Sequence, residues 1–318
     1  MAEKRVLVTG GAGYIGSAVV AALCERGDTV VVFDDLSSGQ REKVHTDAQF
    51  IEGDITDQEA LAAVFERPFD AVLHFAAKKS VAESETNPTA YFHTNVVGAL
   101  NLLACMERHE VPTIVFSSTA AVYKPGYERC PEAAEVGPVN VYGCTKLMVE
   151  ECIREYHRTG VLKRYGVLRY FNVAGDVGLR YIEQNAKNVF PILARAVQSG
   201  DPFRIFGTDY STKDGTCVRD YIHLVDLVDA HLRVLDHDDS GTYNLGTEDG
   251  YSVRELVRAF EEVSGKVVSV EEAPRRAGDP ACLVADAVRA RTELGWRPTK
   301  SLTDMVESTV SVYKTANP

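Results

Sequence analysis

Two residues near the middle of the chain have the types and spacing of an acid–base pair. Tyr142 and Lys146 lie four positions apart in Tyr-Gly-Cys-Thr-Lys, so in a helix both side chains lie on the same face. A phenol with a pKa of about 10 is a poor base at neutral pH, and a neighbouring ammonium group favours the phenolate. The spacing therefore predicts that Tyr142 is a general base tuned by Lys146. A packed tyrosine followed by a surface lysine would have the same spacing.

Hydroxyl groups precede this pair at the end of a predicted strand. The apolar stretch Thr113–Ser117 is followed by Ser118 and Thr119, and open parallel sheets bind ligands at the carboxyl ends of their strands. We therefore expect the hydroxyl of Thr119 to relay a proton to or from Tyr142.

Gly10, Gly13 and Gly16 lie between a strand pattern and a helix pattern at the start of the chain. Dinucleotide-binding turns need glycine for the tight turn, for close approach of the backbone to a pyrophosphate, and for packing of the helix on the strand. The pyrophosphate would lie at the positive N-terminus of that helix. A glycine-rich turn without a ligand is the alternative.

The second predicted strand ends in Asp34, which is followed by Asp35. A carboxylate at this position accepts hydrogen bonds from the adenosine ribose hydroxyls and repels a 2′-phosphate, which favours NAD over NADP. The alternative is that the two aspartates belong to a solvated loop.

These residues need a framework of parallel strands, and residues 1–175 have its pattern. Short apolar stretches rich in β-branched residues alternate with amphipathic helical stretches, which is typical of an α/β fold with a doubly wound parallel Rossmann sheet. The predicted strands are Arg5–Val8, Thr29–Phe33, Gln49–Glu52, Ala71–Phe75, Thr113–Ser117 and Gly166–Tyr170. The predicted helices are Ile15–Glu25, Asp57–Phe65, Pro88–Arg108 and Tyr142–His157.

The alternation loosens in the second half of the chain. Helices are predicted at Val189–Gln198 and Val225–Leu235, among shorter α and β pieces. We therefore expect an NAD-binding Rossmann domain over residues 1–173 and a smaller C-terminal α/β substrate domain over 174–318. Part of the 215–240 region is expected to pack back on the first domain.

Composition excludes several classes of protein. The 318 residues carry a formal charge of −12, whereas nucleic-acid binding favours a basic surface. An anionic ligand must therefore meet locally placed Arg, Lys or helix N-termini. Seven scattered cysteines without a C-x-x-C pair predict neither a disulfide framework nor a metal site. With no signal-peptide pattern and no apolar run long enough to span a membrane, we expect a cytoplasmic protein without membrane partners.

These residues together resemble the extended short-chain dehydrogenase/reductase family, and more closely its UDP-glucose (UDP-galactose) 4-epimerases. The resemblance covers nearly the whole chain, and the run ending in Arg-Asp-Tyr-Ile-His is more specific than the Rossmann core. The matching motifs are GGAGYIG, EGDI, HFAAKKSVAES, SSTAAVY, YGCTK, LRYFN, IFGTDYSTKDGTCVRDYIH and APRRAGD.

The resemblance implies a set of residues around bound NAD. Besides the three glycines, Thr119, Tyr142 and Lys146, it comprises Tyr14, Ile15, Asp34, Asp35, Asp54, Ile55, Phe75, Ala76, Ala77, Lys79, Asn95 and Phe171.

The resemblance likewise implies a UDP-sugar substrate. The substrate-binding positions are Lys79, Thr119, Tyr142, Asn172, Asn188, Arg219, Tyr221, Arg276, Asp279 and Cys282. In the implied reaction, Tyr142 and Thr119 take the proton of the sugar 4-hydroxyl while the C4 hydride moves to NAD. The 4-keto sugar then rotates about its link to the diphosphate and receives the hydride on its other face. The resemblance also implies a role in galactose metabolism.

Three alternatives remain. A 4,6-dehydratase would need acids directly after Thr119, where this chain has Ala120 and Ala121. A UDP-glucuronate-type 4-epimerase would need further basic groups for the sugar carboxylate. A non-catalytic NAD-binding sensor would be expected to lose the set Thr119, Tyr142 and Lys146.

Two departures from the family pattern affect the substrate residues. The segment Gly175–Phe190 lacks a longer insertion, which leaves the substrate loop and the role of Asn188 open. Cys282 stands where some relatives carry tyrosine beside the sugar 2-substituent. A cysteine leaves room for an acetamido group, so we expect UDP-N-acetylglucosamine to be accepted as well, unless Cys282 is simply a small core residue.

The family forms homodimers through paired helices, which here are Pro88–Arg108 and Tyr142–His157. Ala99, Leu100, Leu102, Leu103 and Met106 make the first helix apolar for a surface helix, although the same residues could lie in the core.

Overall fold

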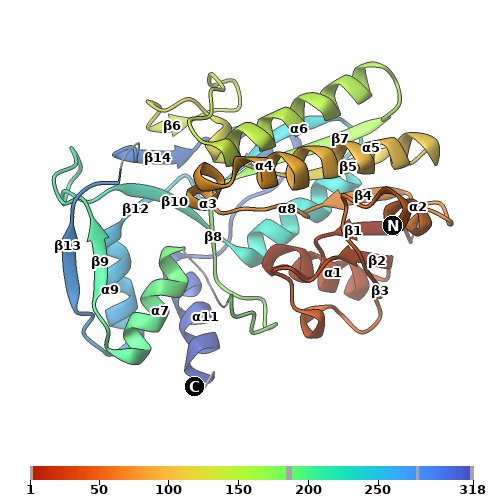
Figure 1. Ribbon diagram of the computed structural model, residues 1–318. Coiled ribbons are helices and arrows are strands. Elements are labelled where there is room, and N and C mark those ends of the chain that lie inside the picture. The colour runs from red at the N-terminus through yellow and green to blue at the C-terminus, as the bar shows by residue number, and fades with distance from the viewer. Residues whose placement is uncertain (1–2, 184–187, 277–278, 316–318) are drawn as a thin grey trace. The chain divides into compact units, whose positions relative to one another are not determined.

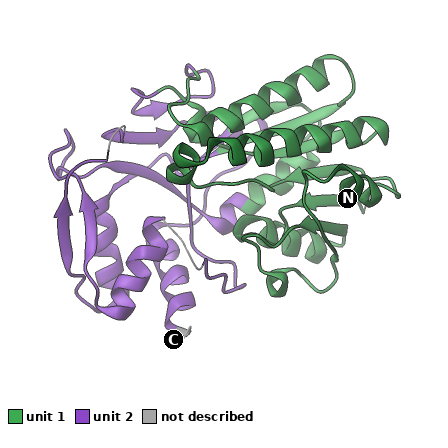
Figure 2. Ribbon diagram, in the orientation of Figure 1, with its two compact units in different colours: residues 1–124, 136–169, 228–243 green, residues 125–135, 170–227, 244–318 purple. Residues whose placement is uncertain are grey.

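The computed structural model describes residues 3–183, 188–276 and 279–315 (Figure 1). Its chain forms two compact units, coloured separately in Figure 2. Unit 1 comprises residues 1–124, 136–169 and 228–243, and unit 2 comprises 125–135, 170–227 and 244–318.

Two segments cross the boundary that the sequence predicts near residue 173. Residues 125–135 belong to unit 2, because the short strand β6 (Arg129–Cys130) pairs with β14 (Cys282–Ala285). Residues 228–243 belong to unit 1, where β11 (Gly241–Leu245) extends the large sheet. The second of these segments overlaps the 215–240 region that is expected to pack back.

A sheet of seven strands, counted over the described residues, builds unit 1 in the order β11-β7-β5-β4-β1-β2-β3. The pairs joining β5, β4, β1, β2 and β3 are parallel, and the order reverses direction beside β1. The expected doubly wound Rossmann sheet is thereby confirmed. The further strands of the sheet are β1 (Arg5–Thr9), β2 (Thr29–Asp34), β3 (Gln49–Glu52), β4 (Ala71–His74), β5 (Thr113–Thr119) and β7 (Arg164–Tyr170).

Helices cover both faces of this sheet. Leu7, Val31 and Ile114 share one apolar core with residues of α2, α5 and α6. Strand residues of the opposite parity, such as Val32, face the other helices, because successive side chains alternate between faces. The helical elements of unit 1 are α1 (Tyr14–Arg26), η1 (Arg41–Lys43), α2 (Gln58–Val64), α3 (Val81–Thr86), α4 (Pro88–Tyr91), η2 (Phe92–Val97), α5 (Gly98–Arg108), η3 (Ala120–Val122), α6 (Val141–Arg158) and most of α8 (Leu224–Asp236).

The single helix predicted for Pro88–Arg108 is interrupted. Its residues Phe92–Val97 form a π-helical turn between α4 and α5, and such turns occur frequently at functional sites. The buried side chain of Asn95 lies in this turn and bonds to residues outside the helix. These bonds depend on tertiary structure, so the apolar periodicity could not predict the interruption.

Unit 2 contains a sheet in the order β12-β10-β14-β6, with β8 also paired to β10, and a parallel pair β13–β9. Helices α7, α9 and α11 enclose its apolar core, to which Phe190, Phe260 and Met305 contribute. Its further elements are β8 (Asn172–Ala174), α7 (Val189–Ser199), β9 (Phe203–Phe206), β10 (Val218–His223), β12 (Gly250–Ser252), α9 (Val253–Ser264), β13 (Val270–Ala273), α10 (Val288–Glu293) and α11 (Leu302–Thr315).

Across the described residues, no helix is both long and apolar enough to cross a membrane. All seven cysteines lie in that part of the chain and are free thiols.

Helix α8 lies so close to β7 that a methyl group at Gly166 would come within 2.1 Å of Cγ1 of Val234. We predict that Gly166→Ala lowers the free energy of unfolding by about 1–3 kcal/mol through overpacking. Val234→Ala should relieve the clash, so the double variant should lose at least about 0.5 kcal/mol less than the sum of the two single variants. Urea unfolding of the three variants measures this coupling. Strict additivity would show that α8 does not pack on β7 in this way.

Candidate active site

Tyr142 lies in the first turn of α6, and that turn is held by side chains. The N–H groups of Val141, Tyr142 and Gly143 donate to Glu85 Oε1 (2.9 Å), Ser84 Oγ (3.1 Å) and Asn140 Oδ1 (2.7 Å), respectively. These groups lack partners within the helix, because a helix leaves its first N–H groups unbonded. The three bonds therefore fix the first turn of α6 and with it the direction of the Tyr142 side chain.

The hydroxyl of Tyr142 is hydrogen-bonded to the side chain of Thr119 at the end of β5. Burial raises the pKa of the Tyr142 phenol to about 12, while the bond from Thr119 opposes this shift and the nearby Tyr91 adds to it. The two hydroxyl groups that the sequence predicts as base and relay are thus in direct contact. A phenol with this pKa needs further positive charge to act as a base near neutral pH.

Lys146 is almost completely buried, with 3% of its surface exposed. Its Nζ donates to the carbonyl oxygen of Ser117 (2.8 Å) and lies 4.8 Å from the centre of the Phe116 ring. Burial lowers the pKa of Lys146 to about 7, although Glu150 opposes the shift. Burial and Lys146 together lower the pKa of His74 to about 3, so that imidazole is neutral. A buried lysine with a perturbed pKa beside a hydroxyl pair is typical of a catalytic site.

The glycine turn before α1 has the geometry of a dinucleotide-binding turn. Gly10 has a φ of +73°, and a methyl group there would lie 2.4 Å from the backbone N of Ala76. A methyl group at Gly16 would lie 2.2 Å from the carbonyl oxygen of Gly10. Only glycine fits at these two positions, since both conflicts involve backbone atoms.

Gly13 differs from the other two glycines. A methyl group there would come within 3.3 Å of Gly10 O and would otherwise extend into open space. Gly13 is also the N-cap of α1, and glycine has no side chain that could accept the first N–H groups of the helix. The turn therefore offers an open cradle at a helix N-terminus, which fits a pyrophosphate group.

Asp34 ends β2 and is buried with 7% of its surface exposed. Its carboxylate accepts the N–H of Ala12 (2.9 Å) in the glycine turn and that of Leu36 (2.9 Å). Burial raises its pKa, against the effect of these bonds. Each oxygen has a second lone pair, so the carboxylate can join the glycine turn and accept ribose hydroxyls as well.

The other residues predicted around the adenosine differ in how far they are buried. Asp35 and Asp54 are exposed and accept bonds from residues of their own turns, Ser37 and Thr56. Ile55 has 3% of its surface exposed and belongs to the apolar core. Its side chain is thus committed to packing, and its carbonyl oxygen accepts a hydrogen bond from Asn101 Nδ2 (3.2 Å).

The predicted residues along the cofactor path have different environments. Phe75 is half-buried, with its ring centre 5.0 Å from that of His231, whereas Lys79 is exposed. The side chain of Asn95 is fully engaged with Lys78 N (2.8 Å), Lys78 O (3.0 Å) and Thr145 Oγ1 (3.0 Å). It therefore links the loop after β4 to α6. Ala76 and Ala77 lie in that same loop, partly buried, and Phe171 is buried in unit 2.

Unit 2 holds the residues predicted to bind the nucleotide part of the substrate. Nη2 of Arg219 donates to Asp279 Oδ1 (3.1 Å), and the guanidinium of Arg276 lies 4.0 Å from the centre of the Phe206 ring. Both arginines are local cations on an acidic protein, and a guanidinium group can bind a phosphate through two parallel hydrogen bonds.

The remaining substrate positions lie around β8, β10 and β14. Asn172 Nδ2 donates to the carbonyl of Asp220 (2.9 Å), and Tyr221 is buried in the core of the unit, 3% exposed. Cys282 is half-buried, with its Sγ 3.8 Å from Glu128 O. Asn188 is exposed at the start of α7, and residues 184–187 of the expected substrate loop lie outside the described residues.

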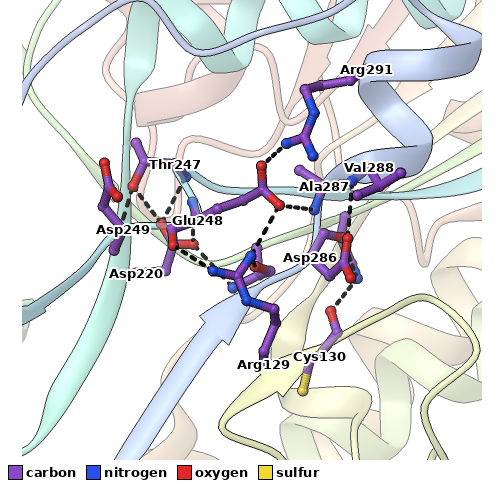
Figure 3. Close-up of polar contacts among 12 residues, drawn as sticks. Arg129, Cys130, Asp220, Thr247, Glu248, Asp249, Asp286, Ala287, Val288 and Arg291 are labelled. Atoms are coloured by element: carbon purple, nitrogen blue, oxygen red, sulfur yellow. Dashed lines mark hydrogen bonds and ion pairs between the residues drawn. The ribbon is translucent and has the colours of Figure 1, made fainter.

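Asp220, between Arg219 and Tyr221 in β10, holds these strands together (Figure 3). Its fully buried carboxylate accepts three backbone N–H groups, from Thr247 (2.8 Å), Glu248 (3.0 Å) and Ala285 (3.0 Å). Burial raises the pKa of Asp220 to about 6 despite these bonds.

Glu248 continues this network (Figure 3). Its carboxylate bonds to Arg129 (3.1 Å) and to Arg291, and so ties β6 and α10 to the turn after β11. Neither Asp220 nor Glu248 was predicted from the sequence.

Sequence reasoning also missed Glu150 and Arg169. Both are buried, and Arg169 donates from Nε (2.9 Å) and Nη2 (2.5 Å) to the two oxygens of Glu150. The available signal was the position of Glu150, one helical turn after Lys146 on the same face. No sequence pattern near Arg169 predicted that it pairs with Glu150.

Comparison with known proteins agrees with this geometry. Residues 6–246 match the model of the NAD dependent epimerase/dehydratase family. A UDP-glucose 4-epimerase of Corynebacterium glutamicum is 44% identical over 304 residues, which cover 92% of this chain and 91% of that protein.

Two solved structures extend the comparison over the whole fold. A UDP-glucose-4-epimerase from Stenotrophomonas maltophila with bound NAD and formylated UDP-arabinopyranose is 39% identical, with a TM-score of 0.93 and 98% of each chain covered. The UDP-Glc/GlcNAc 4-epimerase from Campylobacter jejuni is 38% identical, with a TM-score of 0.87 and coverage of 98% of this chain and 100% of that one. This chain therefore belongs to the NAD dependent epimerase/dehydratase family.

Proposed function

We propose that this protein is an NAD-dependent UDP-hexose 4-epimerase that interconverts UDP-glucose and UDP-galactose through a 4-keto intermediate. The observation that carries the proposal is the contact between the hydroxyls of Tyr142 and Thr119, one helical turn from the buried Lys146. The similarity to UDP-glucose 4-epimerases over nearly the full chain supports the same reaction.

Bound NAD would supply the acceptor and donor of the C4 hydride, together with a positive charge on its nicotinamide ring. Gly10, Gly13, Gly16 and Asp34 would hold its pyrophosphate and adenosine ribose, as the open cradle before α1 and the carboxylate at the end of β2 suggest. Tyr14, Ile15, Asp35, Asp54, Ile55, Phe75, Ala76, Ala77, Lys79, Asn95 and Phe171 are proposed to complete the binding site.

Tyr142 would take the proton of the sugar 4-hydroxyl and later return it to the same oxygen when the 4-keto group is reduced. Its pKa of about 12 must fall for this step, and positive charge favours the phenolate. The ammonium of Lys146 supplies such a charge from the same helical face, and Thr119 stabilises the phenolate by donating its hydroxyl proton in a hydrogen bond.

The nucleotide part of the substrate would provide most of the binding energy. Arg219 and Arg276 are proposed to bind the diphosphate, with Asn172, Asn188, Tyr221 and Asp279 around the rest of the nucleotide. A weakly held hexose can then turn between the two hydride transfers without losing UDP.

The alternatives fit less well. Ala120 and Ala121 follow Thr119 and cannot transfer the protons that a dehydratase must move. A non-catalytic sensor would not need a buried lysine beside a bonded hydroxyl pair. A uronic acid substrate would need a further basic group for its carboxylate, and the basic residues among the proposed substrate positions are Lys79, Arg219 and Arg276.

We also propose a cytoplasmic homodimer formed through α5 and α6. Of the residues that make Pro88–Arg108 apolar, Ala99, Leu102, Leu103 and Met106 lie in the core, and only Leu100 of these five is exposed (39%). The large apolar side chains that these two predicted helices expose are instead Phe92, Val97, Leu100 and Met148. Seven free thiols suit a reducing compartment.

The range of sugars is proposed to include N-acetylated hexoses. Cys282 at the start of β14 is half-buried and smaller than the tyrosine of some relatives. The similarity to a UDP-Glc/GlcNAc 4-epimerase supports this wider range.

Tyr142→Phe should reduce kcat for UDP-galactose by about 10²–10⁴-fold, because the general base is removed. The measurement is product formation by purified protein without added NAD. Tyr156→Phe, on the same helix, is the matched control and should retain wild-type turnover. Near-wild-type turnover of Tyr142→Phe would rule out its role as base, and failure of the wild-type protein to interconvert the sugars would rule out the proposed function.

Gly13→Ala should fold normally and lose most of its bound NAD, because the added methyl group occupies the cradle without a severe clash. The NAD released on denaturation, per mole of purified protein, measures this effect. Gly137→Ala, whose nearest contact is also 3.3 Å, is the matched control. An unchanged NAD content in Gly13→Ala would place the pyrophosphate elsewhere.

Cys282→Tyr should reduce the rate on UDP-N-acetylglucosamine far more than the rate on UDP-glucose, because the larger side chain fills the space for the acetamido group. The ratio of kcat/KM for the two substrates is the measurement. Cys282→Ser, which adds no bulk, should leave the ratio near that of the wild type. If Cys282→Tyr has the same ratio, another residue limits the sugar 2-substituent.

A further inference from the structure

A buried ion pair lies directly behind the catalytic residues. Glu150 of α6 has no exposed surface, and both of its oxygens are bonded to Arg169 of β7, which is 3% exposed. Arg154, one turn further along α6, donates to Oε2 (2.7 Å), and Ser118 Oγ donates to Oε1 (2.5 Å). The guanidinium of Arg169 also lies 4.9 Å from the centre of the Tyr123 ring.

These contacts connect Glu150 to both halves of the catalytic site. Ser118 stands between Ser117, whose carbonyl accepts the Lys146 ammonium, and Thr119, whose hydroxyl contacts Tyr142. The bond from Ser118 to Glu150 therefore anchors the end of β5 to α6. Glu150 also follows Lys146 by one helical turn on the same face.

The groups around Lys146 make Glu150 its main source of negative charge. From β5 the ammonium meets the Ser117 carbonyl and the Phe116 ring, and from β4 the neutral imidazole of His74. From its own helix it meets Glu150, which opposes the effect of burial on its pKa, and the phenol of Tyr142 lies one turn before it. Arg169 on β7 adds a positive charge behind the carboxylate.

A buried charge needs compensation, and the pairing with Arg169 provides it for Glu150. The two parallel bonds from one guanidinium fix the carboxylate in position as well. Replacing such a pair by apolar residues is often tolerated, so a buried ion pair is weak evidence of a stabilising role alone. Its placement beside the lysine suggests a different use.

We infer that Glu150 is a positioning residue that keeps the buried Lys146 protonated and fixes the end of β5 against α6. The inference rests on the proposed function for its kinetic test, because Lys146 must be charged to favour the Tyr142 phenolate. Arg169 acts one step further away, by holding the carboxylate of Glu150.

The test is Glu150→Gln, which has nearly the same size but no charge. The pKa of Lys146, already lowered to about 7 by burial, should fall further once the carboxylate is gone. Activity that needs the ammonium is lost as pH rises through that pKa, so the alkaline limb of the kcat profile should move to lower pH by about one unit. Above both pKa values, each unit lowers the charged fraction of Lys146 by about tenfold.

Glu155→Gln is the matched control, since Glu155 lies on the same helix in an exposed ion pair with Arg158. It should leave the pH profile unchanged. Because Glu150→Gln leaves Arg169 buried beside a neutral amide, the double variant Glu150→Gln/Arg169→Met removes both charges and guards against misfolding. Its alkaline limb should move in the same direction by a smaller amount.

A second readout separates this inference from the proposed function. NMR of protein labelled with [¹³C]lysine follows the titration of Lys146 itself, with Lys146→Met identifying its signal. A lower pKa of Lys146 in Glu150→Gln or the double variant supports the inference even if no sugar is turned over. A folded variant with the wild-type titration and the wild-type alkaline limb overturns it, whereas a wild-type protein inactive on UDP-galactose overturns only the proposed function.

Discussion

The hydrogen bond from Nζ of Lys146 to the carbonyl oxygen of Ser117 joins the two elements that carry the hydroxyls proposed to be catalytic. Helix α6 provides Tyr142, and the end of β5 provides Thr119. An ammonium group at this depth is costly unless it is bonded, so the position of α6 along the sheet is constrained by the need to reach that carbonyl. The side chains that satisfy the first turn of α6 then fix the direction of Tyr142. The chemistry depends on this alignment.

In each unit, a buried carboxylate holds a strand that carries proposed site residues. In unit 1, Glu150 is compensated by an arginine and bonds to the residue before Thr119. In unit 2, Asp220 is compensated mainly by backbone N–H groups, which hold β10 and hence its neighbours Arg219 and Tyr221. Burial raises the pKa of Asp220 to about 6 despite these bonds. Glu150 faces the positive charge of the Arg169 guanidinium.

Features encoded within a few residues were predictable from the sequence. The glycine turn, the strand ending in Asp34 and the pair Tyr142–Lys146 each depend on local spacing, and the parallel strands follow from β-branched stretches buried on both faces. The bounds of three helices predicted in unit 1, Ile15–Glu25, Asp57–Phe65 and Tyr142–His157, agree with those of α1, α2 and α6 within one residue for the same reason. The Thr119–Tyr142 contact was also foreseeable, since the carboxyl ends of parallel strands and the N-termini of the helices that flank them lie at the same edge of the sheet.

Features that depend on tertiary contacts were not predictable. Arg169 and Glu150 are 19 positions apart. Neither lies in a sequence motif that would predict the pairing. The π-helical turn at Asn95 arises from bonds to Lys78 and Thr145, which belong to other elements. The strand β6 has only two residues and pairs with a partner more than a hundred positions away. The apolar residues of α5 mostly face the core because α2 and α6 pack there, and a helical pattern alone cannot distinguish core from interface.

In the proposed reaction, the hydrogen at C4 leaves and returns within one turnover on a retained cofactor. The most direct measurement uses UDP-galactose deuterated at C4, ordinary water and purified protein without added NAD, with the label in the product located by NMR. We expect UDP-glucose that retains deuterium at C4 in full. Loss of the label to water, or conversion only when NAD is supplied in amounts equal to the substrate, would contradict it.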